Sequence, residues 1–248
     1  LMQRTVPIMN GFSKIMDNVG QTRNKGVEVT LNTVNIRSKD WEWKTGINFS
    51  LNRDKIIELR GDGKDDITNR WFIGKPLRVF YDYEVEGIWQ EGDQFTYTTP
   101  EGVEEEIQKG AKPGWAKIKD VNKDGKIDSN DKTIIGSKNP SFLMSMSNTV
   151  TYQNFYLSLL LNGTFKVTRT LNEANIGGWG YSLYNYVADA SYWTPETPDA
   201  KYPSPAYTTF DGHSFYKDFT YINIKNLTLG YNFDRQVCKK IGISGLSV

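Results

Sequence analysis

Apolar and polar residues alternate along several stretches of this chain. Between residues 41 and 52 the odd positions carry most of the large apolar side chains and the even positions are mainly polar. The apolar members are Trp41, Trp43, Ile47, Phe49 and Leu51. A period of two over about ten residues predicts a β-strand whose faces meet different surroundings. Residues 26–33 alternate in the same way, and the short polar connection at 36–40 predicts that the two strands form a hairpin.

The same pattern returns in the second half of the chain. Residues 144–152 and 154–162 predict a second hairpin, and residues 221–233 predict one long strand. That strand would place Leu227, Leu229, Tyr231 and Phe233 on one face. Long excursions, roughly 53–117 and 168–217, separate these elements. We expect an all-β fold, an antiparallel up-and-down meander with about six to eight strands.

Two environments could explain strands with one apolar face. Strands of about ten residues can cross a bilayer when tilted, and short turns opposite long loops are typical of outer-membrane barrels. Trp41 and Trp43, at one strand end, would then belong to an interfacial aromatic girdle. The alternative is a soluble β-sandwich, which has the same periodicity. A barrel predicts apolar stripes that face lipid, whereas a sandwich predicts stripes that meet across a closed core.

The composition excludes several classes of function. The mean hydropathy is −0.55, no apolar run is long enough for a transmembrane helix, and the first residues do not predict a signal peptide. A net charge of +1 gives no field that would attract nucleic acid. The single cysteine, Cys238, excludes an internal disulfide, and the single histidine, His213, is expected in a solvated loop. No pair of carboxylates is singled out as acid and base, so we expect no enzyme.

The segment from Asp120 to Asp131 has the spacing of a calcium-binding loop. Oxygen-bearing side chains fall at positions 1, 3, 5, 9 and 12, and Gly125 stands at position 6, where the backbone must turn sharply. The predicted ligands of a structural Ca²⁺ are Asp120, Asn122, Asp124, Lys126 through its carbonyl, Asp128 and Asp131. Ile127 would pack under the loop. The alternative is a polar hairpin turn, because Asn, Asp and Gly are common turn residues.

The long excursions are rich in aromatic residues. Four tryptophans are candidates for contact with a substrate or a partner: Trp71, Trp89, Trp179 and Trp193. Flat apolar rings with polar tips suit sugar rings and protein surfaces. The alternative, which we favour for any single ring, is that these aromatics pack small cores within the loops themselves.

Four segments together carry a family resemblance. They are residues 18–28, 74–89, 113–136 and 193–203. With them, the chain resembles the C-terminal half of a SusC/RagA-type TonB-linked outer-membrane protein of Bacteroidetes. The match runs over nearly the whole chain.

The resemblance implies a fold and a function. Members of this family are barrels of about 22 strands with an N-terminal plug and a TonB-binding segment. They import oligosaccharides or peptides, usually with a SusD-like lipoprotein. Residues 1–248 would then be part of the barrel, without plug or TonB-binding segment and with further strands to follow. Residues 115–136 would form a calcium-type loop within an extracellular excursion. The competing interpretation is a secreted, calcium-stabilised β-domain that binds glycan.

Overall fold

The chain divides into two compact units, which we describe separately. The computed structural model describes residues 2–5, 9, 11, 14–17, 20–171, 191–207 and 209–248. The sheet unit comprises Leu1–Leu77, Asn139–Val167 and Phe219–Val248. The loop unit comprises Arg78–Lys138 and Thr168–Asp218.

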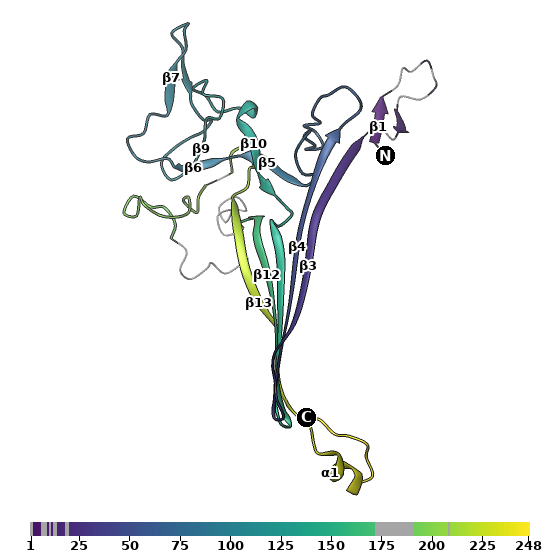
Figure 1. The fold of residues 1–248 in the computed structure, drawn as a ribbon. Coiled ribbons are helices and arrows are strands. Elements are labelled where there is room, and N and C mark those ends of the chain that lie inside the picture. Colours follow the sequence, from purple (N-terminus) through teal and green to yellow (C-terminus); the bar gives the residue numbers. More distant parts are fainter. Residues whose placement is uncertain are drawn as a thin grey trace. The chain divides into compact units, whose positions relative to one another are not determined.

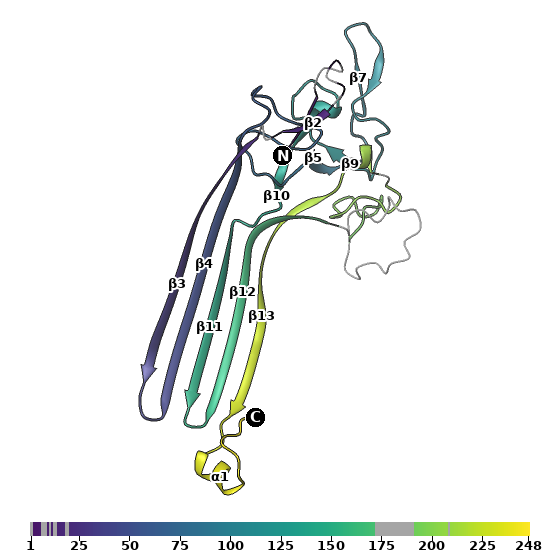
Figure 2. The same cartoon turned by 90° about the vertical axis from the view of Figure 1, so that its right-hand side faces the viewer.

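The sheet unit is built on five long strands in one sheet (Figures 1 and 2). In spatial order they are β13 (Tyr216–Tyr231), β12 (Phe155–Thr170), β11 (Phe142–Tyr152), β4 (Trp41–Glu58) and β3 (Gln21–Arg37). The pairs β3–β4, β4–β11 and β11–β12 are antiparallel. Their short turns lie at one end of the sheet, and the long excursions leave from the other end (Figure 2).

The predicted all-β meander and both hairpins are confirmed, with three corrections. Most long strands extend past their predicted ends, although β13 stops at Tyr231, before the predicted Phe233. Among the described residues, five strands form the sheet, not six to eight. The first excursion runs from residue 59 to 141, not from 53 to 117. The errors in the strand number and in the excursion bounds arise because the short strands of the loop unit resemble strands of the sheet when only local sequence is read.

Smaller elements complete the sheet unit. β1 (Met2–Thr5) and β2 (Lys14–Asp17) form an antiparallel pair near the N-terminus. A short helix, α1 (Arg235–Lys240), follows β13. Within the described ranges, no helix is both long enough and apolar enough to span a membrane.

In its described residues, the loop unit contains three short antiparallel strand pairs and their connections. The pairs are β5 (Val79–Tyr83) with β10 (Lys132–Ser137), β6 (Val85–Ile88) with β9 (Ala116–Ile118), and β7 (Thr96–Thr98) with β8 (Glu104–Glu106). Short 3₁₀ turns occupy Ser129–Asp131 and Phe210–Gly212.

Aromatic side chains form much of the core of the loop unit. One buried cluster consists of Ala116, Tyr202, Tyr207 and Phe215, and a second of Tyr83, Ile118 and Ile127. Burying a large apolar side chain contributes about 1.5–3 kcal/mol, so a few such rings can hold a long excursion in one conformation. The excursion therefore has a core of its own.

Buried polar groups in this core find partners. The Gln108 side chain is fully buried; its Oε1 accepts hydrogen bonds from the Ile118 amide at 2.9 Å and from the Trp89 indole at 3.2 Å. Its Nε2 donates to the Ala116 carbonyl at 2.9 Å. An unpaired buried amide would cost about 1–3 kcal/mol. The hydrogen bonds of Gln108 avoid this cost, and through them one side chain links three segments of the loop unit.

The expected solvated position of His213 is wrong. The side chain is 1% exposed and its ring lies beside Tyr207 and Phe215. Its Nδ1 is 3.0 Å from the carbonyl oxygen of Phe210. A neutral imidazole with one backbone partner can be buried at low cost. The local sequence around a single histidine does not indicate whether that histidine is buried.

Candidate functional site

The register of the sheet gathers the apolar positions on one face. Val29 lies opposite Phe49 and Phe49 opposite Met144, so these three side chains share a face. The other members of this row-by-row alignment are Val27, Leu31, Ile47, Leu51, Met146, Val150, Leu157, Leu159 and Leu161. We call this surface the apolar face.

Many residues of the apolar face are exposed within the described structure. Leu31 is 52% exposed. Leu229, two residues before the Tyr231 that packs on Phe155 and so on the same face, is 74% exposed. The buried apolar clusters of the described residues belong to the loop unit and contain none of these side chains. A soluble sandwich would instead bury such a face against a second sheet. The arrangement is that of a barrel wall, whose outer face contacts hydrocarbon.

Aromatic rings border the apolar face at the end with the short turns. Trp41 packs on Tyr152 with ring centroids 4.5 Å apart, and Phe155 packs on Tyr231 at 4.7 Å. The Trp43 indole donates a hydrogen bond to Asn148 Oδ1 at 3.1 Å. Rings with apolar bodies and polar tips suit a membrane–water interface, and the position of Trp41 and Trp43 in an interfacial girdle stays a prediction.

The opposite face of the sheet is polar. Thr30 donates to Asn48 Oδ1 at 2.9 Å, and Asn48 Nδ2 donates to Ser145 Oγ at 3.3 Å, across three neighbouring strands. These exposed side chains form a hydrogen-bonded row. In barrel transporters the face turned away from lipid is the polar one.

In the predicted calcium loop, between β9 and β10, the carboxylates bind backbone amides. Asp120 Oδ2 accepts from the Gly125 amide at 2.9 Å, and Gly125 has the left-handed backbone, φ 87°, that the turn requires. Asp124 Oδ1 accepts from the Lys126 amide at 3.0 Å. The Asn130 amide donates to Asp128, which is the main reason that the pKa of Asp128 is lowered.

Asp131 closes this loop from inside. It is 0% exposed; its Oδ1 accepts from the Val121 amide at 2.9 Å and its Oδ2 from the Asp128 amide at 2.8 Å. Ile127 is buried with Tyr83 and Ile118 beneath the loop, as predicted. Asp131 therefore ties the two ends of the loop together through backbone contacts.

The loop fits a calcium ion in the kind of donors it offers. Hard carboxylate and amide oxygens and a left-handed Gly125 are what such a loop requires. Among the residues that the structure describes, no three carboxylate, histidine or cysteine side chains come together as a metal-binding group. Coordination would therefore require the carboxylates of Asp120, Asp124 and Asp128 to converge, and the calcium site stays a prediction.

The candidate contact tryptophans have different surroundings. Trp89 is 3% exposed, and Trp193 is also buried, with its indole donating to Gln90 Oε1 at 2.9 Å. Both rings pack inside the loop unit. Trp71 is half-buried and its backbone pairs with Asp66. Trp179 lies outside the described residues. Contact of any of these rings with a substrate or partner remains a prediction, and of the three described rings Trp71 is the most accessible.

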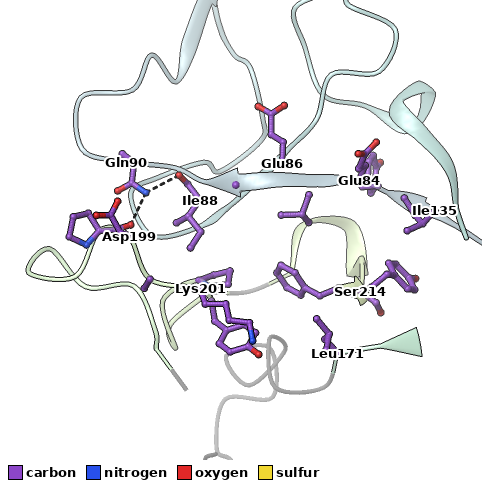
Figure 3. A pocket seen from close by; sticks show the side chains of 18 residues that line it. Glu84, Glu86, Ile88, Gln90, Ile135, Leu171, Asp199, Lys201 and Ser214 are labelled. Atoms are coloured by element: carbon purple, nitrogen blue, oxygen red, sulfur yellow. Dashed lines mark hydrogen bonds between the residues drawn. The ribbon is translucent and has the colours of Figure 1, made fainter. Parts of the chain in front are cut away.

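A cavity of about 680 Å³ in the loop unit was not found by sequence reasoning (Figure 3). Apolar side chains such as Ile88 and Leu171 line it, together with polar ones such as Lys201 and Ser214. Gln90 Nε2 donates to the carbonyl oxygens of Ile88 at 3.1 Å and Pro198 at 3.2 Å, which joins two walls of the cavity. These walls come from segments far apart in sequence, so no local pattern could have indicated the cavity.

Curated relatives match almost the whole chain. TonB-dependent receptor P3 of Formosa agariphila is 31% identical over 98% of this chain and 25% of its own length. TonB-dependent receptor SusC of Bacteroides thetaiotaomicron is 23% identical over 92% of this chain and 22% of its own length. The chain thus spans about a quarter of the length of these relatives. No family model matches the sequence.

Solved structures show the same fold. The RagAB peptide transporter is similar with a TM-score of 0.66 and 22% identity, over 98% of this chain and 28% of that chain. The RagAB peptide importer in the 'open-open' state has a TM-score of 0.68 and 21% identity, over 100% of this chain and 28% of that chain. The five-stranded sheet therefore has the fold of a section of these structures.

The predicted family and outer-membrane localisation are confirmed by these findings. The relatives are named as receptors and transporters, not as enzymes, in agreement with the non-enzyme interpretation. Sequence and fold together show that this chain is a segment related to the TonB-dependent receptors of the SusC type, which are outer-membrane proteins.

Proposed function

We propose that this chain forms part of an outer-membrane importer whose transport depends on TonB. The observation that most supports this proposal is the five-stranded sheet, which has an exposed apolar face and a hydrogen-bonded polar face. Such a sheet serves as a wall between lipid and an aqueous lumen. The competing secreted β-domain would bury the apolar face in a closed core, which the exposure of Leu31 and Leu229 disfavours.

The imported substrate would be an oligosaccharide or a peptide, and the partner a SusD-like lipoprotein. A SusC relative and the RagAB peptide transporter support an importer of this kind without separating the two substrate classes. The loop unit would supply ordered extracellular surface, because its buried aromatic core holds the excursions in shape. TonB would act through a region of the receptor outside this chain.

Uptake measurements test this function. Cells with and without the gene of the complete receptor are supplied with labelled oligosaccharides and, separately, with labelled peptides, in strains with and without TonB. We expect uptake of one class that requires both the receptor and TonB. Uptake that persists without TonB would contradict the mechanism. Co-purification of a lipoprotein with the receptor tests the proposed partner.

The loop from Asp120 to Asp131 would hold a structural calcium ion in this assembly. Six oxygen donors at the expected spacing support it, and the bound ion would neutralise carboxylates that otherwise repel one another. We expect chelation to increase proteolytic cleavage of the complete receptor within residues 115–136 severalfold, and added Ca²⁺ to reverse it. Cleavage elsewhere in the loop unit serves as the control. An unchanged cleavage rate within 115–136 would count against the calcium site.

A further inference from the structure

Four basic residues lie together on one face of the β3–β4 pair. Arg23 is opposite Lys55 and Lys25 is opposite Arg53 in the antiparallel register. Because successive side chains on a strand alternate between faces, the two pairs are neighbours on the same face. The next pair on that face is Val27 with Leu51, so the basic residues continue the rows of the apolar face. We call these four residues the basic quartet.

The quartet brings like charges close together. Directly opposed side chains have Cβ atoms about 4.5–5.5 Å apart, and like charges at that position are destabilising. Arg23, Lys25 and Arg53 are exposed and Lys55 is half-buried. No salt bridge to any of the four occurs within the described part of the chain.

The carboxylate nearest in sequence is engaged elsewhere. Asp54 lies between Arg53 and Lys55 on β4, so its side chain projects to the opposite face. Its Oδ2 accepts from the Leu77 amide at 2.8 Å and its Oδ1 from Asn139 Nδ2 at 2.9 Å. The described chain therefore leaves the positive charge of the quartet without a neutralising partner, and an external anion would relieve the repulsion.

The position of the quartet indicates which anion. On β4 the apolar face and the tryptophans that border it extend from Trp41 to Leu51, roughly 33 Å along the strand at about 3.3 Å per residue. At the usual strand tilt this spans about 25 Å, the height of the apolar band of outer-membrane barrels. Arg53 follows directly, so the quartet begins where the hydrocarbon ends.

The topology places this boundary on the outer side of the membrane. The quartet lies at the end of β3 and β4 from which the long excursion 59–141 leaves, opposite the short turns. In outer-membrane barrels the long loops are extracellular. The charges therefore face the headgroup layer of the outer leaflet.

We propose that Arg23, Lys25, Arg53 and Lys55 form a docking surface for the phosphate groups of a phosphorylated lipid of the outer leaflet. The lipid tails would lie along Val27, Leu31 and Phe49 on the apolar face. Arginine and lysine bind phosphate by charge-assisted hydrogen bonds, and the guanidinium can do so in a bidentate manner. The proposal rests on the outer-membrane placement of the sheet and not on which substrate is imported.

Lipid binding by the complete receptor tests this site. Purified receptor in neutral detergent is titrated with lipid A, a phosphorylated glycolipid, and bound lipid is counted by native mass spectrometry. The test variant carries Lys25→Gln and Arg53→Gln. If each charge contributes as basic residues at an anionic surface do, the variant binds lipid A about 30-fold more weakly. The swap Lys25→Arg with Arg53→Lys keeps both charges and should retain binding.

A matched variant controls for net charge. Lys239→Gln with Lys240→Gln removes two exposed charges from α1, at the other end of the sheet unit, and should leave binding unchanged. Heat-dependent electrophoretic mobility verifies that each variant is folded.

Equal binding by the quartet variant and the wild type, or an equal loss in the α1 variant, would overturn the proposal. So would full displacement of lipid A by millimolar inorganic phosphate, because the site would then be one for soluble anions. Uptake is measured in parallel with the wild-type receptor; lipid A binding that depends on the quartet, together with no TonB-dependent uptake by the wild type, would count against the importer alone.

Discussion

At the residue scale, His213 shows how burial sets the chemistry of the loop unit. Burial lowers the pKa of its imidazole, while the Phe210 carbonyl and the charges of Asp82 and Asp211 act in the opposite direction and only partly offset it. Burial likewise raises the pKa of the neighbouring Tyr207 to about 12. Both side chains are thus held neutral near pH 7.

This burial predicts a pH dependence. The unfolded chain takes up a proton on His213 near its ordinary pKa of about 6.5, whereas the folded loop unit does so only at lower pH. The stability gained from neutral His213 is therefore complete above about pH 6.5 and declines as the pH falls below that value. We expect faster proteolysis of the loop unit at pH 5.5 than at pH 7.5, and a weaker pH dependence in His213→Gln. An identical pH dependence in that variant would refute this assignment.

Asp131 makes a second prediction at this scale. Replacement by Ala would leave the part-buried amides of Val121 and Asp128 without their acceptor. A fully buried amide without a partner costs about 1–3 kcal/mol, so we expect Asp131→Ala to destabilise the loop by about 1–3 kcal/mol in total and Asp131→Asn, which keeps one acceptor, by less. Cleavage within 115–136 is measured in the presence of a chelator, so that bound calcium does not contribute. Glu101→Ala, at an exposed site of the loop unit, is the control; if it and Asp131→Ala are cleaved alike, the capping role fails.

At the scale of elements, β13 departs from simple alternation while keeping one apolar face. A Cβ at Gly163 would lie 3.6 Å from Ile222 Cγ1, and Tyr231 packs on Phe155. Gly163 and Phe155 share the apolar face, so their neighbours Ile222 and Tyr231 lie on that face too. Strict alternation would instead place Ile222 and Tyr231 on opposite faces, because they are nine residues apart. The alternation therefore shifts by one residue between them, as a β-bulge would produce.

The two faces of β3 give a matched pair of substitutions. Leu31 lies opposite Ile47, midway along the apolar face, whereas its neighbour Asn32 lies opposite Gly46 on the polar face. Arginine on the lipid side near the bilayer midplane costs about 2–4 kcal/mol. We expect Leu31→Arg to lower the unfolding free energy of the complete receptor by that amount and Asn32→Arg to change it little. Urea unfolding in lipid vesicles, followed by tryptophan fluorescence, measures both; equal effects would mean that the faces are not lipid and water.

At the scale of the whole molecule, the sheet has two open edges. Within the described residues β3 pairs only with β4, and β13 only with β12. An exposed strand edge offers unpaired amides and carbonyls to other chains. We expect residues 1–248 expressed alone in detergent to elute from size-exclusion chromatography as heterogeneous high-mass species, whereas the complete receptor elutes as one species. A monodisperse monomer of the isolated chain would contradict this expectation.

Much of this arrangement could be predicted from local sequence. The period-two alternation from Trp41 to Asn52 identified the strand and its apolar face, since neighbouring residues on a strand must point in opposite directions. The turn chemistry from Asp120 to Gly125 predicted a tight polar loop, because its oxygens can cap only nearby amides. The excursion boundary at 117 was wrong, because short strands such as β9 and β10 have the same local signature as strands of the sheet.

By itself, then, the sequence determined the strands, the side of each that is apolar, and the loop that could hold a cation. These properties depend on residues within about a dozen positions of one another. Tertiary structure alone decided that β4 pairs with β11, that Trp89 and His213 are buried, and that the basic residues of β3 and β4 stand side by side. Each of these depends on the register between distant segments, and register arises only when the strands pair and the rings of the loop unit pack.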